Sequence, residues 1–447
     1  MYDLRYEVRK RMKWHSVFNG GGVPILAAVL WMAATGAARA GDPSDNHLLG
    51  DWSGLRSGLA TRGAVLDLGY TSEDLHNTRG GSRRATRHAG QLGLGASVDL
   101  EKLVGWDRSS LRVSVTSRDG RNLNTDAGIG ALMQPAEIYG RGQTWRLSEF
   151  WFGHRLLDDR VLLKLGRMNV GSEFGDFECS FANLSFCGNQ AGNIVGDYWY
   201  NWPISQWAAV GRANTGADTY AKLGLYQINP AYLQRNRGFS LNPHGTTGAL
   251  LPMEFGWTPL LAGDRPGSYK AGAWYSTADR ADVLADANGG AAQASGLGFR
   301  QKSGAYGVYI AAKQQVTRGR RDSPQSGLRV FLNIAQADRR TSTVDRTAEV
   351  GGIWRGLAAE RPQDEIGVAL ATTHVNRRAT ETQDIAYAAG QRAYAGGTDE
   401  TTAEAFYGWQ ARPWLLVRFT AQWIHAPGGV ASRPDVVVVG TKTSISF

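Results

Sequence analysis

The stretch QLGLGASVDL, residues 91–100, alternates strictly between two kinds of side chain. One face carries Leu92, Leu94, Ala96, Val98 and Leu100, and the other carries Gln91, Gly93, Gly95, Ser97 and Asp99. A period of two predicts a β-strand. About ten residues are also what a tilted strand needs to cross the hydrocarbon of a membrane. The stretch therefore predicts a membrane-crossing strand with one apolar and one polar face.

The same alternation recurs, more weakly, along the rest of the chain. It is visible over 111–116, 161–165, 220–227, 304–311, 328–334, 365–372 and 436–447. A soluble sandwich also alternates, but here the polar faces are rich in Gly, Ser, Thr and Arg, and no break divides the chain into domains. A barrel with lipid outside and water inside requires strands with one apolar and one polar face. Closure of the sheet into a barrel also removes exposed edge strands. We expect an all-β fold, a transmembrane antiparallel β-barrel.

The first forty residues differ from the rest. Basic residues between Arg5 and Lys13 precede a short apolar run over 23–34, and Ala38-Arg39-Ala40 follows it. This order predicts a secretory signal peptide that is cleaved after Ala40. A membrane anchor fits less well, because the run is short and contains Pro24. We therefore divide the chain into a signal peptide (1–40), an N-terminal periplasmic segment (41–63) and an outer-membrane barrel (64–447).

Composition excludes several classes of protein. Mean hydropathy is −0.32, and after residue 40 no run approaches 18 apolar residues, which excludes a helical membrane protein. Residues 1–40 hold six Lys/Arg and two Asp/Glu, so the net charge of +9 falls to +5 for the remainder, a poor match for nucleic-acid binding. Arg outnumbers Lys by 40 to 9, and Arg presents a planar fork of donors.

A short helix is expected over 53–62, before the first strand and on the periplasmic side. Leu55 and Leu59 share a face at i, i+4 spacing. Ser53 is the expected N-cap, and Gly63 is expected to end the helix.

No catalytic or metal-binding motif is present in the sequence. The eight His residues form no His-Glu-x-x-His pattern, and no Gly-x-Ser-x-Gly or Walker-type loop occurs. Glu173, Asp176 and Glu178 fit loop carboxylates that balance nearby Arg charge better than a hydrolytic pair. We therefore expect neither enzymatic activity nor a cofactor.

Several motifs resemble the OprB-type carbohydrate-selective porin family along nearly the whole chain after residue 40. They are GDWSGLR (50–56), KLGRMN (164–169) with EFG (173–175), FEC (177–179) with LSFCG (184–188), LYQINP (225–230), YKAGAWY (269–275), PWL (413–415) and PGG (427–429). The resemblance implies 16 antiparallel strands and passive diffusion of sugars such as glucose. Thr441 and Thr443, before Ile445 and Phe447, depart from the usual apolar C-terminal pattern of outer-membrane proteins.

The partners expected for such a barrel are outer-membrane lipid and lipopolysaccharide, the barrel-assembly machinery and small sugars, with a monomer or a homotrimer as the assembly. Two alternatives stay open. One is a general or organic-acid-selective porin of the same fold. The other is a protein of another class, an outer-membrane barrel enzyme or a secreted lectin-like β protein.

A sugar has pairs of hydroxyl groups, which arginine guanidinium groups and carboxylates can bind. It also has apolar C–H faces, on which aromatic rings can stack. The pore-lining candidates are Asp99, Arg112, Arg146, Glu149, Trp151, Arg167, Asn169 and Trp199. We expect Arg112 and Arg167 to line the constriction, with Asp99 or Glu149 among them and a residual positive field that favours anions.

The two cysteines, Cys179 and Cys187, are an even number in an exported chain. An oxidising compartment favours a disulfide between them, and the enclosed loop would then be folded into or over the pore. The alternative is two free buried thiols.

Overall fold

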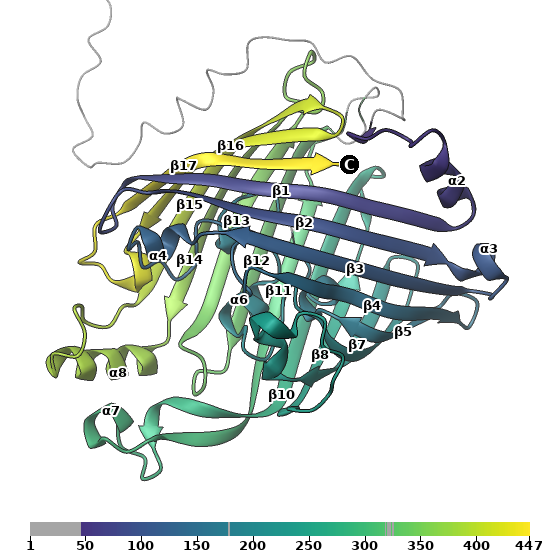
Figure 1. Ribbon diagram of the computed structural model, residues 1–447. Helices are drawn as coiled ribbons and strands as arrows, with labels where there is room; N and C mark the ends of the chain where they lie inside the picture. Colours follow the sequence, from purple (N-terminus) through teal and green to yellow (C-terminus); the bar gives the residue numbers. More distant parts are fainter. Residues whose placement is uncertain (1–45, 178, 318, 320–322, 324–325) are drawn as a thin grey trace, which may run out of the picture. The chain divides into compact units, whose positions relative to one another are not determined.

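Sixteen antiparallel strands close into a barrel in this computed structural model, which describes residues 46–447 except 178, 318, 320–322 and 324–325 (Figure 1). The strands are β1 Ala64–Arg79, β2 Thr86–Asp99, β3 Ser109–Gly120, β4 Trp145–Leu156, β5 Val161–Met168, β6 Gln206–Asn214, β7 Thr219–Ile228, β8 Gly248–Trp257, β10 Arg265–Asp286, β11 Phe299–Gln315, β12 Gly327–Ala337, β13 Val344–Arg355, β14 Glu365–Val375, β15 Asp399–Arg412, β16 Leu415–His425 and β17 Val436–Ser446. The two-residue strand β9, Leu260–Leu261, pairs with the start of β10 and is not one of the strands that form the barrel wall.

Closure is made by the first and last strands. Each barrel strand pairs with its neighbour in the chain, and β1 also pairs with β17, with Gly69 opposite Ser446. The all-β, 16-stranded prediction is confirmed. The expected signal peptide and its cleavage after Ala40 lie outside the described residues.

The alternation in the sequence sets the two faces of the wall. On β5, Leu163 and Leu165 are 42% and 58% exposed on the outer surface, whereas Lys164 between them faces the lumen. On β2, Leu94 faces outward while Gln91 and Gly95 face inward, beside residues of the lumen. The predicted strand is longer than expected at its start, and Leu100 begins a helix instead of ending the strand.

The short helices lie in turns and loops. They are α2 Leu55–Thr61, α3 Leu100–Val104, α4 Leu123–Asp126, α5 Val170–Glu173, α6 Gln190–Ile194, α7 Ala292–Ser295 and α8 Arg377–Ala388, with 3-10 turns η3 Leu184–Phe186, η4 Pro230–Leu233, η5 Arg235–Arg237 and η6 Pro427–Gly429. As far as the structure describes the chain, no helix is both long and apolar enough to cross a membrane.

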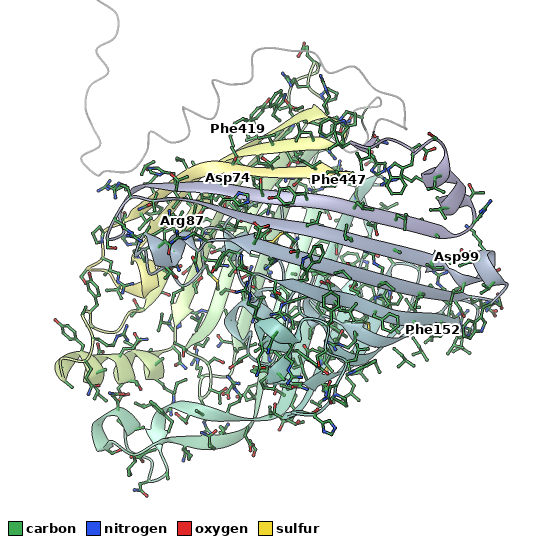
Figure 2. The ribbon with its side chains drawn as sticks, in the orientation of Figure 1. Asp74, Arg87, Asp99, Phe152, Phe419 and Phe447 are labelled. Carbon is green, nitrogen blue, oxygen red and sulfur yellow. A yellow bond between two sulfur atoms is a disulfide. The ribbon has the colours of Figure 1, made fainter. Side chains whose placement is uncertain are left out.

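One end of the barrel has short turns and the other has long loops, which identifies the periplasmic and extracellular ends. Asp158 and Asp159 form one of the short turns, with φ of 52° and 64°. At the opposite end, α7 and α8 lie close together (Figure 1). Figure 2 shows Asp99 at the α3 end of β2 and Arg87 toward the other end of the same strand.

The N-terminal helix α2 is present, but Ser53 does not cap it. Gly54 is the N-cap, in a left-handed conformation, and no side chain caps the helix. Gly63, with φ of 94°, follows the helix, and a Cβ there would lie 2.8 Å from the carbonyl oxygen of Asp99. Arg56 donates to the backbone oxygen of Phe447, so α2 is tied to the C-terminal end of the barrel.

We expect the barrel to show heat-modifiable migration. Each barrel strand pairs with a strand on both sides along at least part of its length, so the sheet has no free edge strand at which unfolding could start. An unheated sample in SDS should run faster than a boiled one, and both should run alike after full denaturation in urea. Equal mobility of boiled and unboiled samples from outer membranes would contradict a closed barrel.

Candidate functional site

Two extracellular loops fold into the lumen. They are the β3–β4 loop (121–144) and the β5–β6 loop (169–205), which we call loop A and loop B. In loop A, Ile138 packs with Leu75 and Val438 on the inner wall. In loop B, Phe181 packs edge-to-face on Phe406, with 4.9 Å between ring centroids. These apolar contacts hold both loops against the wall.

Buried glutamates on the inner wall accept hydrogen bonds from the loop backbones. Glu400 accepts from the amides of Leu132 and Met133 in loop A, at 2.7 and 3.1 Å. Glu404 accepts from Ala182 and Asn183 in loop B, both at 2.8 Å. Glu73 and Glu254 accept from Ile138 and Gly175 in the same way. A buried amide needs a partner, so these carboxylates fix where each loop runs.

Lysines complete the attachment of the loops. Lys442 of β17 lies 2.9 Å from Glu137 of loop A and donates to the carbonyl oxygen of Phe181 in loop B at 2.8 Å. It also lies 3.3 Å from Glu73. One buried ammonium therefore joins both loops to the wall.

The sequence analysis expected the carboxylates of loop B to balance arginines. In the structure they pair with lysines. Lys164 lies 2.7 Å from Glu173, and Lys270 pairs with Asp176. The third carboxylate of that expectation, Glu178, lies outside the described residues.

The loops leave a cavity of about 640 Å³ between them, which we call the loop cavity. Its lining includes the amide side chains Gln134, Asn169, Asn189, Asn193 and Asn201, the charged residues Arg118, Glu137, Arg141 and Asp176, and the aromatic residues Tyr139, Phe177 and Trp202. A second cavity of about 340 Å³, the wall cavity, is lined mainly by β1, β2 and β3. Gln91 and Trp202 line both cavities, so they lie where the two meet.

The two arginines of the loop cavity are held by neutral acceptors. The Nε of Arg118 donates to Gln91 at 2.8 Å. Arg141 donates to the carbonyl oxygen of Gly196 at 3.1 Å. Burial of the Arg141 guanidinium lowers its pKa from the usual value, since desolvation disfavours the charged form.

Three of the predicted site residues meet on the inner wall. The Nε of Arg112 lies 3.2 Å from Glu149, and Arg112 also pairs with Asp67. Trp151 donates from its indole to Glu149 at 3.4 Å, and Lys164 lies 4.3 Å from the centre of its ring. Arg112 lines the wall cavity. The expected pairing of an arginine with Glu149 is therefore present.

Asp99 is not part of that group. Its side chain accepts hydrogen bonds from the amides of Glu101 and Lys102 and so caps α3 at the periplasmic end of β2 (Figure 2). Its carboxylate is directed to the backbone of α3, whereas Glu149 contacts Arg112. Asp99 does line a further cavity, of about 350 Å³, together with Trp151. Of the two carboxylates considered as partners of the arginines, Glu149 is the one that contacts Arg112.

Arg167 was misplaced by the sequence analysis. It shares the alternation of Leu163 and Leu165, so it lies on the outer face and not in the lumen. It donates to the carbonyl oxygens of Ser205, at 2.6 Å, and Ser240, and its guanidinium lies 4.0 Å from the ring centre of Tyr232. These contacts bury it between the wall and the β7–β8 loop.

Arg146 faces inward but is only 2% exposed. Its guanidinium donates to the carbonyl oxygens of Arg141, Tyr232 and Leu233, at 2.7, 2.8 and 3.1 Å. With its donors already used within the protein, it braces loops and has none of the freedom that contact with a solute requires.

Both arginines hold the β7–β8 loop (229–247), which we call the wall loop. Strand β5 has only 8 residues, because the chain turns into the lumen after Met168. The extracellular part of β4 therefore lacks a strand neighbour on that side, and the amide of Leu147 instead donates to Gly238 of the wall loop at 2.9 Å. The wall loop completes the barrel wall above β5.

Trp199 is also not a sugar platform. It is fully buried and packs edge-to-face on Trp274, 5.3 Å away. Asn169 does line the loop cavity, while its side-chain oxygen accepts from the amide of Ser172 at 2.8 Å and caps α5.

The sequence analysis missed four residues that line the loop cavity: Arg118, Glu137, Arg141 and Trp202. Only Arg118 had a signal, the alternation that it shares with Arg112.

Cys179 and Cys187 are disulfide-bonded in the structure, with 4.1 Å between their Cα atoms. Both line the loop cavity, so the bond closes a short segment of loop B beside the pore. We expect protein that is denatured without reductant to show no thiol reactive toward maleimide, and reduced protein to show two. Two labelled thiols without reductant would contradict the disulfide.

Comparison with known proteins assigns the chain to a family. The family model described as "Carbohydrate-selective porin, OprB family" matches residues 83–447. Porin B of Pseudomonas aeruginosa is 36% identical over 436 residues, which cover 94% of this chain and 96% of Porin B. The putative porin QuiX of Acinetobacter baylyi is 33% identical over 95% of this chain and 98% of its own.

The fold has a solved relative as well. The high-pH structure of Pseudomonas putida OprB superposes with a TM-score of 0.88 at 36% sequence identity, and the match covers 92% of this chain and 100% of that one. The closed barrel of the present chain and its porin relatives indicate that the protein lies in the outer membrane of a Gram-negative bacterium. The same relatives indicate a channel rather than an enzyme. The chain therefore belongs to the carbohydrate-selective porin family, OprB type.

Proposed function

We propose that small neutral sugars, glucose among them, diffuse passively into the periplasm through the loop cavity and the wall cavity. The observation that carries this proposal is the lining of the loop cavity by several amide side chains next to an indole. Family membership supports it, because the family is described as carbohydrate-selective.

Amides and an indole suit the chemistry of a sugar. Several of these amides already donate within loops A and B, so a sugar hydroxyl group would donate to their side-chain oxygens and would also meet the hydroxyl groups of Tyr139 and Ser172. The ring of Trp202 offers an apolar face for the C–H side of a pyranose. Since each sugar contact only replaces one with water, net binding is weak, and a solute that binds weakly can leave again.

Liposome swelling tests the proposal directly. Proteoliposomes should swell faster in glucose than in neutral amino acids or organic acids of matched size, and disaccharides should enter more slowly than glucose. Equal rates for all solutes of one size would show a general porin of the same fold. No swelling in glucose would overturn the proposed function.

Replacing Trp202 by Ala should weaken the block of ion current by glucose about threefold to tenfold, because the stacking face at the junction of the cavities is lost. Planar-bilayer recordings with increasing glucose measure the effect. Trp106→Ala is the matched control, since Trp106 lies outside the lumen and packs on Phe152 at 5.3 Å. An unchanged glucose block in Trp202→Ala would remove Trp202 from the sugar path.

Export and assembly complete the proposal. Removal of residues 1–40 would leave Gly41 as the first residue of the protein in outer membranes, which N-terminal sequencing checks. Lipopolysaccharide and the barrel-assembly machinery are the proposed partners in the membrane. Chemical cross-linking of intact cells distinguishes a monomer from a homotrimer.

A further inference from the structure

The cavity of about 350 Å³ that Asp99 and Trp151 line lies at the periplasmic end of the lumen, and we call it the mouth cavity. Its lining comes from the inner faces of β2, β3 and β4, from the start of β1 and from α2 and α3. Arg112, which lines the wall cavity, donates to Ser97 of the mouth cavity at 2.7 Å. The two cavities therefore adjoin, and a solute that leaves the wall cavity enters the mouth cavity before it reaches the periplasm.

The register of three strands gives the mouth cavity a floor of small residues. Asp99, Ser110 and Gly153 lie opposite one another across β2, β3 and β4. Trp151 lies two residues before Gly153 and shares its inward face. A Cβ at position 153 would lie 2.9 Å from the hydroxyl of Ser110 and 3.1 Å from the ring of Trp151. The glycine therefore keeps open the space between the carboxylate on one side and the indole on the other.

Asp99 has one carboxylate oxygen that is not used for capping. Its Oδ1 accepts from the amides of Glu101 and Lys102 at 3.1 and 3.2 Å. The ammonium of Lys102 lies 3.7 Å from Oδ2, which is too far for a hydrogen bond. Because the side chain of Asp99 is 43% exposed, Oδ2 can accept hydrogen bonds from a solute.

Trp151 supplies an apolar surface on the other side of the floor. Its indole donates to Glu149 at 3.4 Å, and the ammonium of Lys164 lies 4.3 Å from the ring centre. These two contacts fix the orientation of the ring, and the ammonium occupies only one of its faces. The ring also lines the mouth cavity, where it can stack on the C–H face of a sugar.

We infer that the mouth cavity is an exit subsite for one neutral sugar ring, which stacks on Trp151 and donates from two neighbouring hydroxyl groups to Asp99. The inference rests on the proposed function and adds a separate binding site for the same solute. A carboxylate is an acceptor only, and its hydrogen bonds are stronger than those between neutral groups. Ligand pockets usually measure about 300–1,000 Å³, so a cavity at the lower end of that range fits a monosaccharide and not a longer chain.

A weak site at the periplasmic end eases the release of the solute. A solute leaves a single deep site slowly, whereas several weak sites in series divide the exit into small steps. The carboxylate of Asp99 also repels anions, so the subsite favours neutral sugars over sugar acids. Since the subsite faces the periplasm, its loss must affect glucose from the two sides of the membrane unequally.

Block of the ion current by glucose added to one side of a planar bilayer tests the inference. In Trp151→Leu, block by glucose from the periplasmic side should weaken about threefold to tenfold, because the stacking face is lost. Block by glucose from the extracellular side should change less than about twofold, because that glucose meets the loop cavity first. Every protein tested carries Arg340→Cys in an exposed extracellular loop, so that a bulky maleimide label added to one side identifies the orientation of each channel.

Further substitutions separate contact with the sugar from support of the wall. Trp151→Phe keeps an aromatic face but loses the donor to Glu149, and it should retain most of the block from the periplasmic side. Asp99→Ser keeps an oxygen that can cap α3 but has no second oxygen, and its block from that side should weaken about threefold to tenfold. Asp107→Ser is the matched control, because Asp107 is exposed in the next turn and does not line the cavity. Heat-modifiable migration verifies that each variant has folded.

The results that contradict the exit subsite differ from those that contradict the proposed function. Equal weakening of the block from both sides in Trp151→Leu overturns the subsite, because the ring would then only shape the pore. Equal loss in Trp151→Phe and Trp151→Leu also overturns it, since the donor to Glu149 would then account for the effect. An unchanged periplasmic block in Trp151→Leu or in Asp99→Ser does the same. All of these results leave the proposed function intact, whereas an unaltered protein with neither glucose block nor glucose uptake overturns the proposed function itself.

Discussion

Replacing Lys442 by Met is expected to lower the free energy of unfolding by about 3–5 kcal/mol, the usual cost of removing one member of a buried ion pair. Glu73 and Glu137 would keep buried charges without their common cation. Loop B would also lose the donor to Phe181. With both loops loosened, single-channel conductance should rise and become noisier.

Urea unfolding in detergent or lipid gives the stability, and planar-bilayer recording gives the conductance. Lys102→Met is the control. Lys102 is exposed, and its ammonium lies 3.7 Å from Asp99, a surface pair worth less than about 1 kcal/mol. If both lysine variants unfold at the same urea concentration and conduct alike, Lys442 does not anchor the loops.

Replacing Arg146 by Leu is expected to cost about 3 kcal/mol and to open the wall above β5. The variant leaves the carbonyl oxygens of Tyr232 and Leu233 without their charged donor, and each hydrogen bond to a charged group contributes about 1.5–3 kcal/mol. The wall loop would then detach from β4. Protease added to intact cells should cut the variant within 229–247, where the unaltered protein resists.

Arg237→Leu is the matched control, because Arg237 lies in the same loop with its side chain exposed. It should leave stability and protease resistance unchanged. If Arg146→Leu is cut no faster than Arg237→Leu, Arg146 does not hold the wall loop against β4.

The barrel could be predicted from the sequence because each strand repeats one physical rule. Lipid outside and water inside impose a period of two, and stretches such as 220–227 and 365–372 lie within β7 and β14. The ends of strands were less predictable. Leu100 fits the alternation of β2, yet Asp99 caps a helix there, since a single capping side chain can override a weak strand signal.

The site was predictable only where it lies on the wall. Arg112, Glu149 and Trp151 are inward residues of regular strands, and alternation finds them. Arg167 would have been excluded by the same rule, had its parity with Leu163 been followed. The lining contributed by the loops has no period, because loops A and B take their course from single contacts with distant strands.

Those contacts also constrain the order in which the protein can assemble. The hydrogen bonds of Glu400 and Glu404 with the two loops join residues 268 and 222 positions apart, and that of Lys442 with Glu137 spans 305 positions. Both loops therefore precede β15 and β17 by 222 or more positions, although β1 and β8 also hold them from nearer in the chain. Contacts of such long sequence separation form slowly. We therefore expect β15 to β17 to pair last, around loops that the earlier strands already hold. Closure of the barrel and narrowing of its pore would then occur together, so a closed barrel with an unobstructed lumen would not form during assembly.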